Sequence, residues 1–230
     1  MATAAAAKVG VTIWRLRPAQ AADQGARLLV QGDESELVPE RVGTEMQLSV
    51  RDRVRLTIES PREGYLYVVD RELYSDGTKG EPYLIFPTTR TRGGDNRVGP
   101  GKLIDIPAQE DKPNYFTLIP SPGRNDQVGE VLSIIVTTEP LENFEPTSRP
   151  LKLAPAQVEK WEKTWGGLFE QYDLEGGEGQ AWTQAESEAS KAGAGSRYLT
   201  QEEPTPQTIY LVEAKNNKGL LVTVPLRYKR

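Results

Sequence analysis

The sequence predicts a mainly β domain, an antiparallel β-sandwich with a helical insertion before a C-terminal hairpin. Three observations predict this fold class. Short segments alternate apolar and polar residues with a period of two, as half-buried strands do. The chain contains 21 Gly and 17 Pro, which is typical of a fold with many turns. One segment, GYLYVVD at residues 64–70, is continuously apolar and aromatic, as a strand buried on both faces would be.

The expected strands follow one another along most of the chain. Residues 64–70 should be central in a sheet. Asp76-Gly77 should supply the turn of a hairpin, because Gly adopts a positive φ at little cost. The segments expected to form strands are residues 9–16, 27–31, 45–50, 54–58, 64–70, 82–86, 102–106, 115–119, 130–138, 208–214 and 220–227.

After Pro150 the pattern changes from strand to helix. Apolar residues recur at spacings of three and four in residues 154–172, and Pro155 suits a first helical turn. Gly166-Gly167 weakens this helix, and Trp161 and Trp165 should dock it on the sheet. A second helix is expected at residues 181–191, ending near Gly193. We therefore expect a single domain over residues 1–230, with a helical insertion at 154–193 and a closing hairpin at 206–230.

The composition excludes several classes of chemistry. The chain has no Cys and no His, so disulfides, zinc sites of Cys and His, and Ser-His-Asp or Cys-His nucleophiles are impossible. Carboxylate, Lys, Tyr or Ser/Lys chemistry remains open, as do oxygen-ligated Ca²⁺ and Mg²⁺. We expect no cofactor and no catalytic residue.

Charge and hydropathy limit the partners. The net charge of -5 gives no general attraction to nucleic acid, so we expect none to bind. No apolar run approaches the roughly 18–20 residues that span a bilayer. The Ala-rich residues 1–7 lack the basic and apolar regions of an intact signal peptide. The absence of Cys slightly favours an extracytoplasmic compartment, either the periplasm or the cell surface.

Motifs in the centre of the chain resemble a known family. They are GYLYVVD at residues 64–70, the Asp76-Gly77 turn, LIFP at 84–87, DNRVGPGKLIDIP at 95–107 and GEVLSIIVTTEPL at 129–141. In order and spacing, residues 44–141 resemble the bacterial domain of unknown function 4384 family, often found beside caspase-like peptidase, protein kinase or repeat domains. The resemblance implies an accessory β-sandwich with no assigned active site.

A basic, Gly-rich stretch at residues 88–102 is one candidate binding site. It holds Arg90, Arg92, Arg97 and Lys102 against the single acid Asp95. Backbone amides and Arg side chains in such a loop can bind a phosphate or carboxylate. The alternative is a solvated loop in which Asp95 and Asn96 cap turns. The stretch is not a Walker phosphate loop, because Leu103 follows Gly101-Lys102 where Ser or Thr is needed.

Aromatic and acidic residues supply weaker candidates. Tyr65, Tyr67, Tyr74 and Tyr83 surround the first hairpin and could form an exposed strip for sugars or a partner, or could be half-buried strand neighbours. Asp70, Asp76 and Asp95 could ligate Ca²⁺, but no DxDxDG loop exists, and we expect no metal. Two acids could also serve as a glycosidase pair, but a chain with 33 acids always offers some pair, so the sequence selects none.

Residues 154–192 are acidic. They hold three Lys and eight acids, and so carry the whole net charge of the chain; the acids are Glu159, Glu162, Glu170, Asp173, Glu175, Glu178, Glu186 and Glu188. This segment and the basic loop could pair within one molecule or between copies.

Three functions are compatible with these observations. The first is a non-catalytic binding or accessory module of unknown ligand that mediates protein–protein or envelope interactions. The second is a self-assembling structural subunit that uses strand addition. The third is a carboxylate-based glycan hydrolase, which requires two acids facing each other across a cleft.

Overall fold

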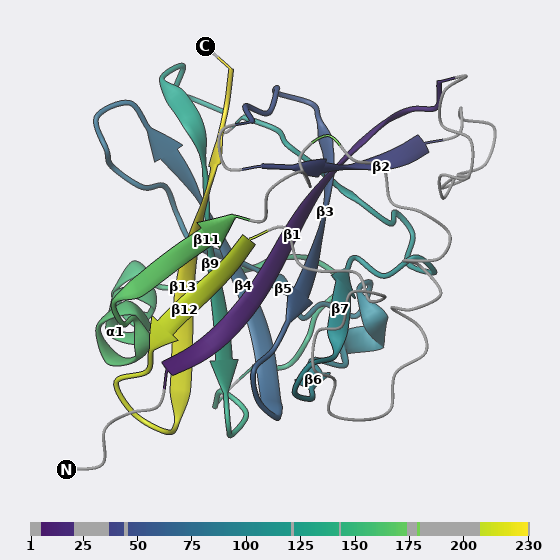
Figure 1. Cartoon of the computed structure of the whole chain (residues 1–230). Coiled ribbons are helices and arrows are strands. Elements are labelled where there is room, and N and C mark those ends of the chain that lie inside the picture. The colour runs from purple at the N-terminus through teal and green to yellow at the C-terminus, as the bar shows by residue number, and fades with distance from the viewer. Residues whose placement is uncertain are drawn as a thin grey trace.

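The structure, a computed structural model, describes residues 6–20, 37–43, 46–120, 122–142, 144–173, 179 and 208–229. Their strands form two antiparallel sheets that pack face to face, so the predicted β-sandwich is confirmed. In Figure 1 one sheet crosses diagonally in front of the other, and the helix lies to one side of both. No helix among these residues is long and apolar enough to cross a bilayer.

The first sheet has seven strands. Its main path runs β11-β12-β1-β3-β7, while β2 also pairs with β1 and β8 with β3. The strands are β1 (Ala6–Pro18), β2 (Leu37–Val42), β3 (Arg53–Glu59), β7 (Leu103–Ile106), β8 (Phe116–Thr117), β11 (Phe169–Asp173) and β12 (Thr208–Glu213).

The second sheet has six strands. It runs β10-β5-β4-β9-β13, with β6 also paired to β4. The strands are β4 (Gly64–Tyr74), β5 (Tyr83–Phe86), β6 (Arg97–Val98), β9 (Gln127–Thr137), β10 (Leu151–Lys152) and β13 (Gly219–Arg227). The short 3₁₀ helix η1 (Arg92–Gly94) precedes β6, and the helix α1 (Pro155–Trp165) follows β10.

The main core lies between the two sheets. Alternate residues of each strand point into it, such as Val9 and Val11 of β1 and Leu66 and Val68 of β4. Val9, Leu66 and Val68 are fully buried. The period-two alternation read in the sequence therefore marks this inner face correctly.

The six-stranded sheet is also covered on its outer face. Trp161 of α1 packs there against Phe144, with ring centroids 5.8 Å apart, and stacks on Trp165 at 6.2 Å. The ring of Trp165 lies against Gly219, where a side chain would collide with it. This double covering explains why residues 64–70 read as a continuous apolar run, and it confirms that the tryptophans dock the helix.

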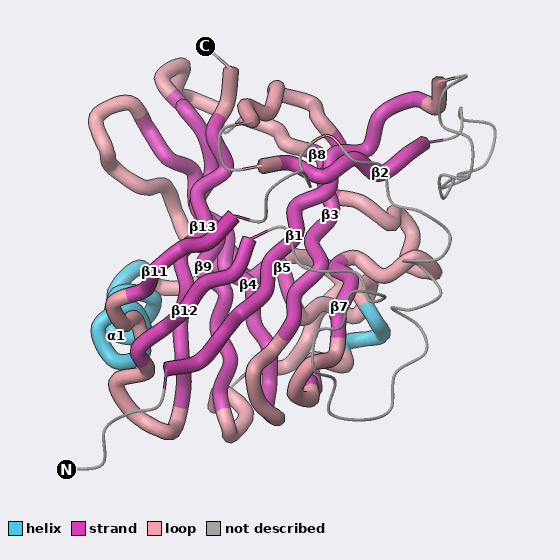
Figure 2. The backbone as a smooth tube through the Cα atoms, viewed as in Figure 1, coloured by secondary structure: helices cyan, strands magenta, loops and turns pink. Residues whose placement is uncertain are grey.

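The chain termini join the same sandwich from opposite sheets. β1 lies inside the seven-stranded sheet, between β3 on one side and β12 and β2 on the other. β13 pairs with β9 in the six-stranded sheet. The predicted C-terminal hairpin therefore does not form as a paired unit, because the connection after β12 crosses from one sheet to the other (Figure 2).

Two further predictions differ from the structure. The strand expected at residues 45–50 is reduced to a single bridge between Leu48 and Tyr228. The helix expected to reach Tyr172 ends at Trp165, and β11 follows it. The reason is Gly166-Gly167, where the chain leaves the helix and passes close to β12. A side chain at Gly167 would meet the carbonyl oxygen of Glu213 at 2.0 Å, so only Gly allows this close approach. The segments predicted at residues 27–31 and 181–191 lie outside the described residues.

Candidate functional site: a carboxylate pocket

Two acidic side chains, Asp70 and Glu130, line one cavity between the sheets. The cavity has a volume of about 200 Å³. We call it the carboxylate pocket. Its other walls are mostly apolar and come from β3, β5, β9, β13 and the segment around β8: Val54, Leu56, Ile85, Phe116, Thr117, Leu118, Ile119, Leu132 and Leu226.

Strand periodicity explains why both acids point inward. Leu66 and Val68 belong to the main core, and Asp70 continues their alternation along β4. On β9, Glu130 continues the alternation of Leu132 and Ile134 in the same way. Asp70 pairs with Leu132, so Glu130 is its diagonal neighbour on the same sheet face. Such neighbours lie roughly 7–8 Å apart, so one ligand group could contact both carboxylates.

A β-bulge in the neighbouring strand shapes the wall beside Asp70. Val68 pairs with Phe86, but Val69 pairs with Leu84, so Ile85 is an extra residue in β5. Both Ile85 and Phe86 consequently pack on the main core instead of alternating between faces. The extra side chain, Ile85, lines the carboxylate pocket.

The pocket favours the protonated forms of both acids. Burial, followed by the nearby charges of Glu130 and Glu72, raises the pKa of Asp70 well above its usual value. Burial also raises the pKa of Glu130 to about 7, with a further contribution from Glu72 and an opposing hydrogen bond from Tyr228. Strongly raised pKa values in a cavity are a physical marker of functional sites.

Neither acid has a cationic partner among the described residues. The hydroxyl of Tyr228 donates a hydrogen bond to Oε1 of Glu130. The Oδ1 atom of Asp70 is buried and has no hydrogen-bond partner among these residues. A buried carboxylate oxygen without a partner loses its solvation without compensation, so a ligand that donates to it would relieve that cost.

The acids suggested as Ca²⁺ ligands do not come together. Asp76 lies in the exposed β4–β5 turn, where it accepts hydrogen bonds from Thr78 and Arg124. Asp95 accepts a bond from the Arg97 amide in another turn. Among the described residues, no group of three acids could hold a metal ion.

Part of the backbone of the basic loop is already bonded within the chain. The carboxylate of Asp111 accepts hydrogen bonds from the amides of Arg92, at 3.0 and 3.2 Å, and Ala108, at 2.6 Å. An internal anion therefore already sits where the loop was predicted to bind one. Asn96 is bonded to Leu66 through its side-chain amide and its carbonyl. Asp95 caps a turn, as the alternative interpretation of the loop expected, whereas Asn96 bonds across to β4 and does not cap a turn.

The cationic side chains of the loop lie apart from the carboxylate pocket. Arg90, Arg97 and Lys102 are exposed, and Arg92 is half-buried beside Asp95, with 3.9 Å between Nη2 and Oδ2. None of the four lines the carboxylate pocket. Of the described acids in the 154–192 segment, Glu162 contacts Lys79 at 3.5 Å and not this loop. Residues 175, 178, 186 and 188 lie outside the described residues.

The four tyrosines do not form one exposed strip. Tyr67 and Tyr74 are buried, and Tyr65 packs partly against the cluster beneath α1. The hydroxyl of Tyr67 accepts a hydrogen bond from the Leu141 amide at 2.9 Å. Only Tyr83 of the four is classed as exposed, at 36%. The half-buried interpretation of these residues fits what the structure shows.

Comparisons with models of known families, with curated proteins and with solved structures were made for the whole chain. None of the three gives a match. The family resemblance of residues 44–141 therefore stays a prediction.

Glu130 and Tyr228 were not singled out from the sequence, and Asp70 was considered only as a calcium ligand. A signal for the two acids is nevertheless present. Asp70 follows Leu66 and Val68 at a spacing of two, and Glu130 precedes Leu132 and Ile134 at the same spacing. An acid at a core-facing position of a strand is unusual enough to mark a site.

Proposed function

We propose that this chain is a non-catalytic binding module whose carboxylate pocket receives an ammonium group on an aliphatic stem, such as a Lys side chain of a protein partner. The observation that carries the proposal is the buried Oδ1 atom of Asp70, which has no hydrogen-bond partner among the described residues. An ammonium group donates three hydrogen bonds and accepts none, so it complements two neighbouring carboxylates.

The walls and the size of the pocket suit such a stem. Leu56, Phe116 and Leu132 offer apolar surface along which methylene groups can lie. The volume of about 200 Å³ is below the roughly 300–1,000 Å³ of sites for drug-sized molecules. A single inserted side chain is therefore a better match than a large ligand.

The other two functions from the sequence receive less support. A glycan hydrolase needs carboxyl groups on either side of the bond to be cleaved, whereas Asp70 and Glu130 come from neighbouring strands of one sheet face. A subunit that donates its first strand needs that strand to be available. In this chain β1 is already paired along both edges.

Binding should release protons. Because the pKa of Glu130 is about 7, part of the population is protonated at neutral pH, and the ammonium group binds the ionised form. The affinity should therefore rise as the pH increases from 6 to 8. Calorimetry in buffers of different ionisation enthalpy would detect the released protons.

The test is calorimetry of the whole chain with Nα-acetyl-lysine methylamide, a lysine whose backbone ends are blocked and whose side-chain ammonium group is free. The matched probe is N-acetyl-norleucine methylamide, which has the stem but no ammonium group. We expect the lysine probe to bind and the norleucine probe to bind at least tenfold more weakly. Asp70→Asn and Glu130→Gln should each weaken binding of the lysine probe by about ten- to a hundredfold, which corresponds to the roughly 1.5–3 kcal/mol of a hydrogen bond to a charged group.

Glu63→Gln is the matched control, because Glu63 is an exposed acid just before β4. It removes the same charge without touching the pocket. Equal affinity for the two probes would overturn the proposal. So would a Glu63→Gln variant that loses as much affinity as Asp70→Asn.

A further inference from the structure

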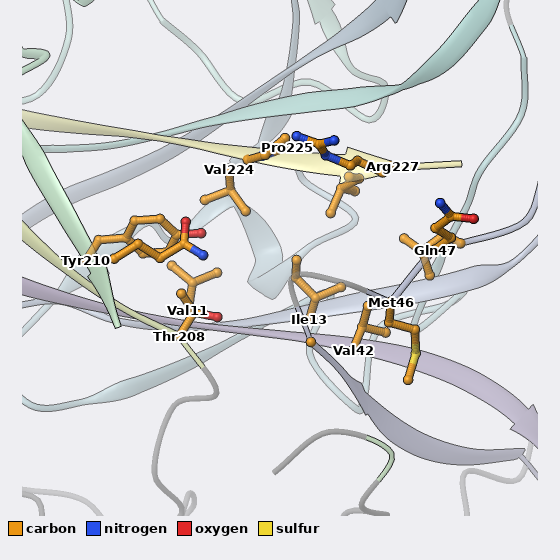
Figure 3. A pocket seen from close by; sticks show the side chains of 14 residues that line it. Val11, Ile13, Val42, Met46, Gln47, Thr208, Tyr210, Val224, Pro225 and Arg227 are labelled. Carbon is orange, nitrogen blue, oxygen red and sulfur yellow. The ribbon is translucent and has the colours of Figure 1, made fainter. Parts of the chain in front are cut away.

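A second cavity lies where the two sheets diverge, between β13 on one side and β1, β11 and β12 on the other (Figure 3). Its volume is about 290 Å³, just below the roughly 300–1,000 Å³ of sites for drug-sized molecules, so it suits a smaller ligand. We call it the corner cavity. It shares Leu226 with the wall of the carboxylate pocket, but neither Asp70 nor Glu130 lines it.

One end of the corner cavity is polar. In Figure 3 the side chains of Tyr210 and Thr208 from β12 lie there, and Gln171 of β11 pairs with Tyr210 across the sheet. Tyr210 is only 2% exposed, and its ring packs edge-on against Phe169 at 5.6 Å. Its hydroxyl forms no hydrogen bond with another described residue, whereas Thr208 donates to Asp173 at 2.9 Å. The ring is buried, but the hydroxyl is not among the buried side-chain atoms that lack a partner, so it can be reached from the cavity and is available to a ligand.

The hydroxyl of Tyr210 is a donor at every physiological pH. Burial, assisted by the charge of Asp173, raises its pKa above the usual value. A ligand atom that meets it can therefore accept a hydrogen bond from it, although the hydroxyl oxygen can also accept one. The amide of Gln171, with one donor and one acceptor group, could complete the polar end.

The other end of the corner cavity is mostly apolar. In Figure 3 Ile13, Val42 and Met46 lie there beside the amide of Gln47, whereas Val224 lies nearer to Tyr210. Among the described residues that line the cavity, Arg227 is the one that carries a charge. Its neighbour Leu226 points into the core, so strand alternation directs the Arg227 side chain to the opposite face of β13. The interior therefore offers no countercharge to an ionised ligand.

An added β-strand is a poor occupant of this cavity. β13 is the last strand of the main path of its sheet, but Pro225 lies near its C-terminal end and has no amide hydrogen to donate. Proline on an edge strand is a common way of preventing strand addition. A small molecule is the better match to the cavity.

We propose that the corner cavity binds an uncharged small molecule with an apolar ring or short chain and one hydroxyl or carbonyl head that accepts a hydrogen bond from Tyr210. The apolar body lies against Ile13, Val42 and Val224, and the head lies beside Tyr210 and Gln171. This site is independent of the carboxylate pocket, because its ligand is neutral and its polar groups are different.

The test uses three probes that share one ring and differ only in the head: cyclohexanol, cyclohexanecarboxylate and cyclohexylammonium. Methyl NMR spectra of the whole chain would locate each probe. We expect cyclohexanol to shift the methyl signals of Ile13, Met46 and Val224. The two charged probes should affect these signals at least tenfold more weakly at equal concentration.

Two variants test the polar end. Tyr210→Phe removes only the hydroxyl, and Gln171→Ala changes an exposed residue that the core does not need. Each should weaken cyclohexanol about three- to tenfold, the effect of one hydrogen bond. Tyr83→Phe, which removes an exposed hydroxyl elsewhere, should have no effect. An unchanged affinity in both Tyr210→Phe and Gln171→Ala would overturn the proposal.

The readout also separates this proposal from the lysine pocket. Cyclohexylammonium that shifts Val54 and Leu132, but not Ile13 or Val224, would report binding in the carboxylate pocket. If none of the three probes shifts Ile13, Met46 or Val224, the corner cavity does not bind this class of ligand. That result would leave the function of the carboxylate pocket untouched.

Discussion

Glu72 on β4 lies directly opposite Glu130 on β9 in an antiparallel strand pair. Like charges at directly opposed positions destabilise a sheet. Asp70 adds a third acid on the same sheet face. The charge of Glu72 raises the pKa of both Asp70 and Glu130, and the charge of Glu130 also raises that of Asp70. The fold therefore carries an electrostatic cost at this position, which is what sites retained for function often show.

The first prediction concerns the pH dependence of stability. The pKa of Glu130 is about 7 in the folded chain and near 4.5 when unfolded, so the folded state binds the extra proton between these values. The free energy of unfolding should therefore fall as the pH rises from about 4.5 to 7, by on the order of 3 kcal/mol from this group. In Glu130→Gln this decrease should be smaller, and the variant should be more stable than the parent at pH 8.

Urea unfolding between pH 4.5 and 8.5 would measure this dependence. The comparison is between the slopes of the two proteins, since Asp70 contributes in the same direction in both. Identical pH slopes for the parent and Glu130→Gln would show that Glu130 titrates normally in the folded chain.

The second prediction concerns the partner of Glu130. The hydroxyl of Tyr228 donates to this carboxylate and so lowers its pKa relative to burial alone. Tyr228→Phe should raise the pKa of Glu130 above 7 and destabilise the chain by about 1–3 kcal/mol at pH 8. Carbon NMR of the Glu130 carboxyl group would follow the titration. Tyr83→Phe, which removes an exposed hydroxyl, should leave the curve unchanged.

Most of the longer strands could be predicted from sequence because local alternation records which face is buried, but β2 was not predicted and the residues of β11 were expected to be helical. Residues 64–70 show this most clearly, since both faces of β4 are covered and the segment is apolar throughout. Local patterns do not record which strands pair. β12 and β13 are adjacent in sequence with clear strand patterns, yet they belong to opposite sheets, because strand pairing is decided by contacts with β1 and β9 far along the chain.

The carboxylate pocket could be predicted from the sequence only in part. The core-facing positions of Asp70 and Glu130 follow from the alternation of their own strands. Their proximity depends on the register between β4 and β9, which sets Asp70 opposite Leu132. No local signal fixes that register across some sixty residues of intervening chain, so the pair could not be selected among the 33 acids.

The third prediction concerns the helix that covers the outer face. Trp161 is 7% exposed and packs on Phe144 within the cluster above Tyr67 and Ile135. Trp161→Ala should destabilise the chain by about 3–5 kcal/mol, the usual cost of removing a buried aromatic side chain. Leu168→Ala is the control, because Leu168 is 81% exposed and should change little. Thermal unfolding that gave the same midpoint for both variants would contradict this account of α1.

The last prediction concerns the N-terminal strand. β1 pairs with β3 from Gly10 to Leu16 and with β12 from Ala6 to Val11, and Val9 and Val11 are in the main core. Deleting residues 1–16 would leave β3 and β12 without their shared neighbour and expose the apolar face beneath them. We therefore expect the truncated chain to lose its cooperative unfolding transition altogether.

Deleting only residues 1–5, which precede β1, should leave the transition in place. Both variants can be compared by circular dichroism during heating. A chain lacking residues 1–16 that unfolded with an unchanged midpoint and cooperativity would show that the fold does not need β1. That result would favour self-assembly by strand donation.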